Sequence, residues 1–160
     1  MNNQPAIIQT ESKILVGKKL EMSHSNDLTK YLWQSFMPRK KEILKRTSEN
    51  LFSMQVYPAT YDLNKFDPDA KFTKWAAVEV KELEDIPPGM EVHLLQGGLY
   101  AVFNYKGERA GAGEFFRCIF EEWLPGSGYV LDQREHFEVL GEKYNKDSDT
   151  SEEGVWIPIR

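Results

Sequence analysis

A proline-rich connector near the middle of the chain constrains the fold more than any other feature. This segment, EDIPPGM at residues 84–90 of 160, carries two prolines and a glycine and can continue neither a helix nor a central strand. On each side of it the apolar pattern indicates the same order of elements: strand, amphipathic helix, strand, strand. The chain is therefore predicted to hold two β-α-β-β units, at about residues 13–83 and 90–160, although residue identities do not repeat at a fixed period.

The first unit is expected to begin with a strand, KILVGKKLEM at 13–22, while residues 1–12 show no sustained periodicity and are expected to be loosely ordered. Three- and four-residue spacing of apolar side chains predicts a helix through Leu28, Leu32, Trp33 and Phe36. Pro38 predicts a kink or break in that helix. Two β-rich runs, 51–63 and 72–83, complete the unit.

The second unit follows the same order. EVHLLQGGLYAVFNYKG at 91–107 is predicted to be a strand broken at its Gly-Gly pair, and GEFFRCIFEEWL at 113–124 a helix. Strand character returns within 129–144. The closing run VWIPIR is predicted to be a last strand, and Pro158 within it suggests an edge of the sheet.

Composition excludes several classes of protein. The net charge of −5 removes the positive footprint that non-specific nucleic-acid binding needs. The chain has one basic cluster, which is interpreted as a solvated helix face. It consists of Arg39, Lys40, Lys41, Lys45 and Arg46. No apolar run approaches the roughly 20 residues of a membrane span, and no N-terminal stretch is typical of a secretory signal, so a cytoplasmic location is predicted.

Candidate metal and nucleophile sites are weak. The three histidines, His24, His93 and His136, are far apart and lack metal-ligand spacing, so neither a metal nor another cofactor is predicted. The single cysteine, Cys118, lies in the apolar run FFRCIF and is expected to be a small buried hydrophobe. Acyl-transfer catalysis has no local support, because there is no GxSxG elbow and no histidine near Cys118.

Several short motifs in fixed order carry a family resemblance. They are KWAAVEVKELEDIPPGMEVHLLQGGLYAVFNYKG at 74–107, Trp33, WLPGSGY at 123–129, HFEVL at 136–140 and IPI at 157–159. From about residue 13 to 160 the chain resembles the GyrI-like family, the effector-binding domains found alone or attached to AraC-type and MerR-type multidrug regulators. The resemblance implies one α+β domain: two β-α-β-β modules about a pseudo-twofold axis, antiparallel sheets with helices, and a central ligand cleft.

Glu138 is the candidate carboxylate of that cleft. Period-two alternation in HFEVL places His136, Glu138 and Leu140 on one face of a strand and the two residues between them on the other. A carboxylate buried there without a partner would cost several kcal/mol or take up a proton, and a cationic ligand would remove that penalty. The resemblance implies that Glu138 neutralises cationic drugs; a glutamate pointing to solvent is the alternative interpretation.

Aromatic residues are the other candidate ligand contacts, because aromatic faces bind flat apolar groups and organic cations. The resemblance places six of them on the helix and strands that face the cleft: Trp33, Phe36, Tyr57, Trp75, Phe103 and Tyr105. For each of them, packing in the core is an equally good interpretation.

Three functions remain open at this point. The first is binding of apolar, cationic small molecules for sensing or sequestration. The second, which the resemblance suggests, is hydrolysis of cyclopropane-bearing compounds with Glu138 as general base beside Tyr57 or Tyr105. The third is a protein-interaction role like that of gyrase-inhibiting relatives. The two units occupy the 160 residues and leave no room for a helix-turn-helix, so a DNA-binding regulator would be a protein partner.

Overall fold

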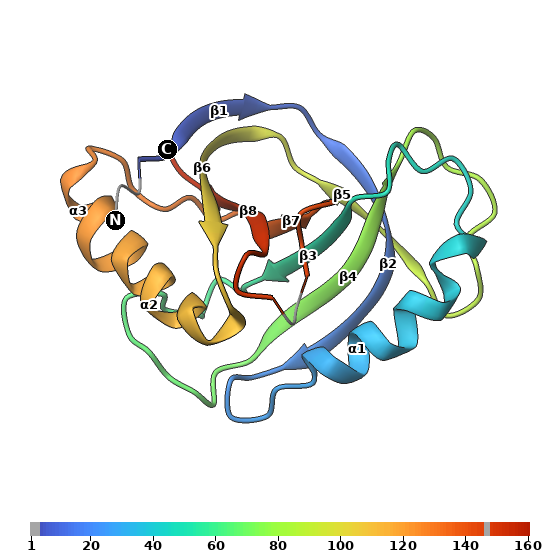
Figure 1. Cartoon of the computed structure of the whole chain (residues 1–160), viewed down its shortest axis with the longest axis horizontal. Helices are drawn as coiled ribbons and strands as arrows, with labels where there is room; N and C mark the ends of the chain where they lie inside the picture. Colours follow the sequence, from blue (N-terminus) through green and yellow to red (C-terminus); the bar gives the residue numbers. More distant parts are fainter. Residues whose placement is uncertain (1–3, 146–147) are drawn as a thin grey trace.

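A computed structural model describes residues 4–145 and 148–160 and contains one eight-stranded antiparallel sheet, with strand order β1-β6-β8-β7-β3-β4-β2-β5 (Figure 1). The strands are β1 (Ala6–Thr10), β2 (Lys13–Met22), β3 (Leu51–Val56), β4 (Phe72–Val80), β5 (Glu91–Leu95), β6 (Gly98–Lys106), β7 (His136–Leu140) and β8 (Glu152–Pro158). The helical segments are α1 (Thr29–Phe36), η1 (Met37–Glu42), η2 (Arg109–Gly111), α2 (Ala112–Arg117), η3 (Cys118–Trp123) and α3 (Leu124–Gly126). The predicted α+β class is confirmed.

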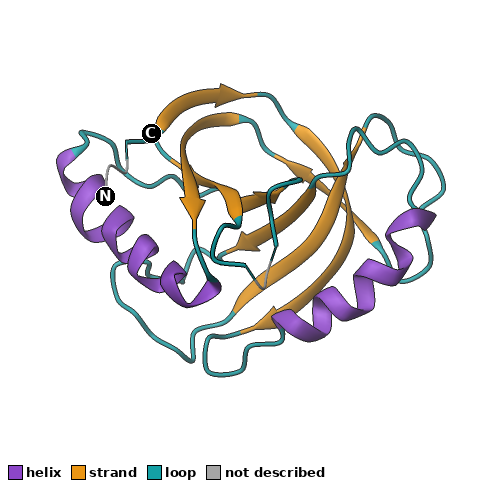
Figure 2. Ribbon diagram, viewed as in Figure 1, coloured by secondary structure: helices purple, strands orange, loops and turns teal. Residues whose placement is uncertain are grey.

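The sheet curls because two long ribbons pair with each other. Only two residues separate β1 from β2, and two separate β5 from β6. β1 pairs with β6, with Thr10 opposite Gly98, and β2 pairs with β5, with Lys13 opposite Leu95. The two edge strands of the sheet are β1 and β5. Along the chain, β1 continues into β2 and β5 continues into β6, and in each case the second strand lies in the opposite half of the sheet. Figure 2 shows the helices outside this curl of strands.

The strand registers reveal the internal duplication. A shift of 85 residues carries β1 onto β5, β2 onto β6 and β3 onto β7, and a shift of 79 carries β4 onto β8. The pair Phe52 and Ala77 then falls on the observed pair Phe137 and Trp156. The two predicted β-α-β-β modules are therefore confirmed, and each is preceded by one further strand, β1 or β5.

Three apolar clusters form the core. One lies between α1 and the sheet and includes Leu32 and Phe36; another lies between α2–η3 and the sheet and includes Phe115 and Ile119. The third occupies the opposite, inner face and draws on residues from β2 to β8. There, Phe137 stacks on Trp156 with ring centroids 5.1 Å apart. Both faces of the central strands are thus covered by apolar side chains except near the pseudo-twofold axis.

Two expectations about the ends of the chain are wrong. The region expected to be loosely ordered contains β1, whose pairing with β6 satisfies its backbone. Pro158 does not mark an edge strand, because β8 lies between β6 and β7 and the edges are β1 and β5. Pro158 is tolerated since it is the last residue of β8, where the ladder ends.

The helix boundaries follow the prolines and a local irregularity. α1 ends at Phe36, and Pro38 opens the 3-10 segment η1, as the predicted break requires. The helix predicted over 113–124 is less regular than expected, because its second half, η3, is π-helical. Among the described residues, no helix is both long enough and apolar enough to cross a membrane.

Gly17 offers a test of the sheet packing. A Cβ atom added to Gly17 would lie 2.0 Å from the carbonyl oxygen of Ala76 and 2.6 Å from the Cα of Ala77, both of them backbone atoms. We expect Gly17→Ala to lower the free energy of unfolding in urea by about 1–3 kcal/mol, the usual range for overpacking.

Gly113→Ala is the matched control for this substitution. Gly113 lies in α2, and a Cβ atom there would meet nothing within 4 Å. Because alanine favours helices, this variant is expected to be as stable as the wild type or up to about 1 kcal/mol more stable. Equal stability of the two variants would contradict the proposed packing of β2 against β4.

Candidate functional site

The pseudo-twofold axis passes through a polar patch on the helix-bearing face of the sheet. In β3 and β7 every second side chain, including Phe52 and Phe137, points into the inner cluster. The side chains between them point to the other face and form a row that we call the central polar row: Ser53, Gln55, His136 and Glu138. Ser53 lies opposite Glu138, and Gln55 lies opposite His136. Leu51 and Leu140 continue the row with apolar side chains.

Glu138 is the charged member of this row and remains partly exposed. Gln55 Nε2 donates a hydrogen bond to Glu138 Oε2 at 3.1 Å, which fixes one carboxylate oxygen. Ser53, Gln55 and His136 are only 8%, 9% and 5% exposed. Among the side chains that the structure describes, no lysine, arginine or histidine forms an ion pair with Glu138. Its negative charge thus has a hydrogen-bond donor but, among these side chains, no counter-charge.

Aromatic rings border the row. Tyr57 packs edge-on against His136 with centroids 5.0 Å apart, and it also contacts Tyr61 at 4.6 Å and Phe72 at 5.6 Å. On the other side, Phe120 of η3 lies 6.5 Å from the His136 ring. Rings from the β3–β4 connection and from the helix of the second module thus both lie against the His136 imidazole, two residues before Glu138 in β7.

The electrostatics leave a single charge in the row at neutral pH. Burial, together with the positive charge of Arg134, lowers the pKa of His136 to about 4, so the imidazole is neutral. Burial and the nearby negative charge of Glu138 raise the pKa of Tyr57, so its hydroxyl stays protonated. Two neutral polar groups thus flank the Glu138 carboxylate.

The structure brings together only some of the predicted site residues. Tyr57 lies close to Glu138, and Trp33 is partly buried on the same side of the sheet, where it packs edge-on against Phe36 at 5.9 Å. Phe36, the last residue of α1, is fully buried between that helix and the sheet. For the hydrolytic alternative, Tyr57 is therefore the tyrosine beside the candidate base, because Tyr105 packs elsewhere.

The other three predicted aromatics lie in the core. Phe103 and Tyr105 pack under α2 and η3, where Tyr105 contacts Phe115 and donates a hydrogen bond to the carbonyl oxygen of Glu108. Trp75 is 4% exposed and lies on the inner face, with its ring 5.3 Å from His93. Trp75 therefore lies on the opposite side of the sheet from Glu138.

Gln55, Tyr61 and Phe120 complete the site, and none of them was predicted from the sequence. Alternation alone puts Ser53 and Gln55 on one face of β3. Only the pairing of β3 with β7, across 83 residues of chain, places Gln55 beside Glu138. The polar alternation in LFSMQV was the one available sign.

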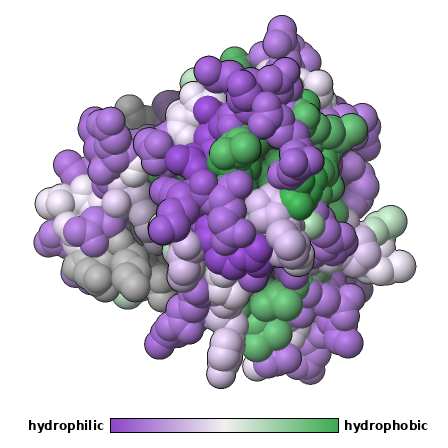
Figure 3. Space-filling model, turned by 90° about the vertical axis from the view of Figure 1, so that its right-hand side faces the viewer, coloured by the Kyte–Doolittle hydropathy of each residue, from purple (hydrophilic) through white to green (hydrophobic). Residues whose placement is uncertain are grey.

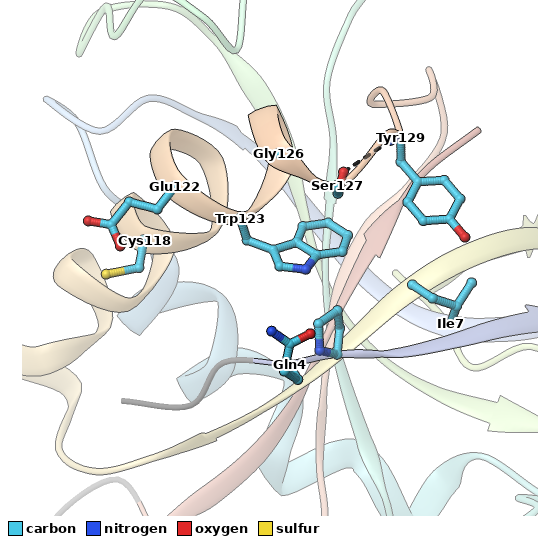
Figure 4. Close-up of a pocket in the computed structure, with 9 residues that line it drawn as sticks. Gln4, Ile7, Cys118, Glu122, Trp123, Gly126, Ser127 and Tyr129 are labelled. Atoms are coloured by element: carbon cyan, nitrogen blue, oxygen red, sulfur yellow. Dashed lines mark hydrogen bonds between the residues drawn. The ribbon is translucent and has the colours of Figure 1, made fainter.

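A separate groove of about 580 Å³ lies between β1 and the η3–α3 segment (Figure 4). Its lining residues are Gln4, Pro5, Ile7, Cys118, Glu122, Trp123, Gly126, Ser127 and Tyr129. The rings of Trp123 and Tyr129 are nearly parallel, with centroids 6.4 Å apart. Cys118, which was expected to be buried, is partly exposed here because its position on η3 faces the groove. The groove shares no residue with the central polar row.

Exposed apolar side chains are scattered over the surface. The most exposed aliphatic ones are Leu94 (66%), Leu44 (55%), Leu83 (51%) and Val130 (51%). Figure 3, which turns the right-hand side of Figure 1 to the viewer, shows several apolar areas divided by hydrophilic residues. Among the described residues, no three histidine, cysteine, aspartate or glutamate side chains are grouped closely enough to hold a metal ion.

Two fused β-α-β-β modules, with a carboxylate and aromatic rings at their junction, define a class of ligand-binding α+β domain. Residues 3–160 match the family described as the GyrI-like small molecule binding domain. The chain therefore belongs to the GyrI-like family, which confirms the resemblance found in its sequence motifs.

One curated relative is the transcriptional regulator BrlR of Pseudomonas aeruginosa. It is 26% identical over 159 residues, which cover 99% of this chain and 56% of BrlR. The chain thus spans about half the length of that regulator.

Solved structures share the fold. The C-terminal domain of EcmrR matches with a TM-score of 0.74 and 14% identity, covering 100% of this chain and 99% of that domain. The protein SAV2435, solved with tetraphenylphosphonium bound, matches with a TM-score of 0.72 and 17% identity, covering 98% of this chain and 93% of SAV2435. At these identities the likeness concerns the fold.

Proposed function

We propose that this domain binds organic cations that carry aromatic or other apolar groups, with Glu138 as their counter-charge, and that binding serves to sense or sequester them. The observation that carries the proposal is the Glu138 carboxylate, which is partly exposed, lacks an ion-pair partner among the described side chains and lies near Tyr57 and beside His136, against which Tyr57 and Phe120 pack. A partly exposed carboxylate without an ion-pair partner attracts a cation that is placed beside it.

The hydrogen bonding of Glu138 suits a ligand that carries a positive charge but has no hydrogen-bond donors. Gln55 engages Oε2 of Glu138 and leaves Oε1 to face the ligand. The faces of Tyr57 and Phe120 would each contribute about 0.5–2 kcal/mol to binding of a cation placed over them. A lipophilic cation without N–H groups, such as a phosphonium, needs only these two kinds of contact.

A ligand with several rings must displace part of the aromatic border. Tyr57 and Tyr61 pack on each other and on Phe72, and they belong to the β3–β4 connection, which holds neither helix nor strand between residues 57 and 71. Movement of this connection would expose the central polar row without breaking a strand ladder. We infer that Tyr57 and Tyr61 cover the site in the absence of ligand.

The relatives agree with this proposal in chemistry and in role. Tetraphenylphosphonium, which is bound in the SAV2435 structure, is a cation enclosed by four phenyl rings. BrlR is a transcriptional regulator. Ligand binding by this domain would then either control the activity of a transcriptional regulator or lower the free concentration of the compound.

Calorimetric titration tests the proposal with two probes of similar shape. Tetraphenylphosphonium is expected to bind saturably, and more tightly than neutral triphenylphosphine oxide by at least about tenfold. Equal affinity for the two compounds, or no saturable binding of either, would refute the role of a counter-charge.

Tyr57 allows a test of the aromatic border. Tyr57→Ala is expected to weaken tetraphenylphosphonium binding by about 3- to 30-fold, the equivalent of one lost cation–π contact. Tyr57→Phe keeps the ring and is the matched control, with an expected change of less than about threefold. Titration calorimetry measures both variants, and a larger loss in Tyr57→Phe than in Tyr57→Ala would show that the hydroxyl, rather than the ring, contacts the ligand.

A further inference from the structure

The structure assigns Ser53 as the residue that restricts the proposed cation site to ligands with a single positive charge. This inference rests on the proposed function, because it concerns the number of charges that the site at Glu138 accepts. It follows from the position of Ser53 relative to the pseudo-twofold axis and from the charges around it.

Ser53 and Glu138 are equivalent positions in the two modules. The shift of 85 residues that relates β3 to β7 carries Ser53 onto Glu138, and the two residues lie directly opposite each other in the antiparallel ladder. Directly opposed residues have Cβ atoms about 4.5–5.5 Å apart. The backbone therefore offers two places for a carboxylate side by side at the axis, and this chain fills one with glutamate and the other with serine.

The groups that lie next to Glu138 add no charge. Gln55 is an amide, His136 is a neutral imidazole, and Tyr57 carries a protonated hydroxyl. Arg134 is engaged elsewhere: its guanidinium bonds to Asp132 and to the carbonyl oxygens of Leu99 and Ile159. Lys74 and Glu153 lie on the same face but away from the axis, where Lys74 is opposite Gln55 in the β3–β4 ladder and Glu153 is opposite Tyr105 in the β6–β8 ladder. At the axis itself, the site thus presents one negative charge, that of Glu138.

Charge matching then decides the ligand class. A monocation neutralises Glu138 and leaves no charge behind. A dication held at the same place brings a second positive charge among side chains that are 5–9% exposed, where burial of an unpaired charge costs several kcal/mol. A carboxylate at position 53 would pair that second charge, so the serine sets the preference.

A matched pair of phosphonium ions tests this assignment. Benzyltriphenylphosphonium carries one charge, and p-xylylenebis(triphenylphosphonium) carries two charges on similar groups. In the wild type the dication is expected to bind no more tightly than the monocation. In Ser53→Asp the affinity ratio of dication to monocation is expected to rise by at least about tenfold over that in Ser53→Asn, which has the same shape without the charge.

An unchanged ratio in Ser53→Asp, or a wild type that prefers the dication by tenfold or more, would overturn the role of Ser53. Failure of the proposed function looks different: the wild type would then bind benzyltriphenylphosphonium no more tightly than triphenylphosphine oxide.

A charge swap decides the matter if Ser53→Asp does not fold. The double variant Ser53→Glu/Glu138→Ser keeps the net charge and moves the carboxylate to the equivalent position across the axis. It is expected to bind benzyltriphenylphosphonium within about tenfold of the wild type and to keep the preference for one charge, whereas Glu138→Ser alone loses binding. A swap variant as weak as Glu138→Ser would contradict the equivalence of the two positions.

Discussion

Replacing Glu138 with glutamine is expected to weaken the binding of tetraphenylphosphonium by about 30- to 100-fold. Glutamine has the shape of glutamate and can still accept a hydrogen bond from Gln55, so the change removes the charge and little else. Two unit charges about 5 Å apart attract each other by roughly 3 kcal/mol at an effective dielectric constant of about 20. Titration calorimetry at fixed salt measures the loss directly.

The control for this substitution is Glu142→Gln. Glu142 is exposed, follows β7 and contributes the same unit of net charge. Its replacement is expected to change the affinity by less than about twofold, because exposed charges are screened by solvent and salt. Binding of triphenylphosphine oxide should be the same in both variants. An equal loss of cation binding in Glu142→Gln and Glu138→Gln would mean that net charge, and not the site, attracts the cation.

The second large effect concerns acid stability. Because His136 has a pKa of about 4 in the folded protein and an ordinary value of 6.5, the unfolded chain takes up a proton at this residue before the folded protein does. The stability that neutral His136 contributes is complete above pH 6.5 and is lost as the pH falls from there to about 4. We expect this loss to reach about 3 kcal/mol, at 1.36 kcal/mol per pKa unit.

Urea unfolding of the wild type and of His136→Gln at several pH values between 7 and 4 measures this contribution. The variant lacks the titrating group, so its stability should fall less steeply over that range. Parallel curves would show that His136 is not held neutral by its surroundings. Protonation of His136 also places a positive charge beside Glu138, so cation binding should weaken over the same range.

The duplicated fold could be predicted from the sequence because its signs are local. The Pro-rich connector separates the modules, and the helical spacing from Leu28 to Phe36 identifies the first helix. β1 was missed, since AIIQT is a short run whose partner, β6, lies about 90 residues away. The π-helical stretch η3 was missed because apolar spacing does not distinguish it from an α-helix.

The site could be predicted only in part, for a similar reason. Alternation in HFEVL separates Glu138 from Phe137, and the structure confirms that these two side chains lie on opposite faces. In FTKWAAVEV both faces of the strand carry apolar residues, so alternation could not tell that Trp75 points inward. Gln55 and Phe120 reach the site through strand pairing and helix packing, which arise from contacts between residues distant in sequence.

The location of a bound cation tests the proposed function most directly. A crystal of the protein soaked with tetraphenylarsonium, which has the shape and charge of tetraphenylphosphonium, would reveal the arsenic atom by its anomalous scattering. We expect one peak beside the Glu138 carboxylate, with Tyr57 and Phe120 around the phenyl rings. A peak only in the groove lined by Trp123 and Tyr129, with nothing at Glu138, would contradict the assignment of the cation site.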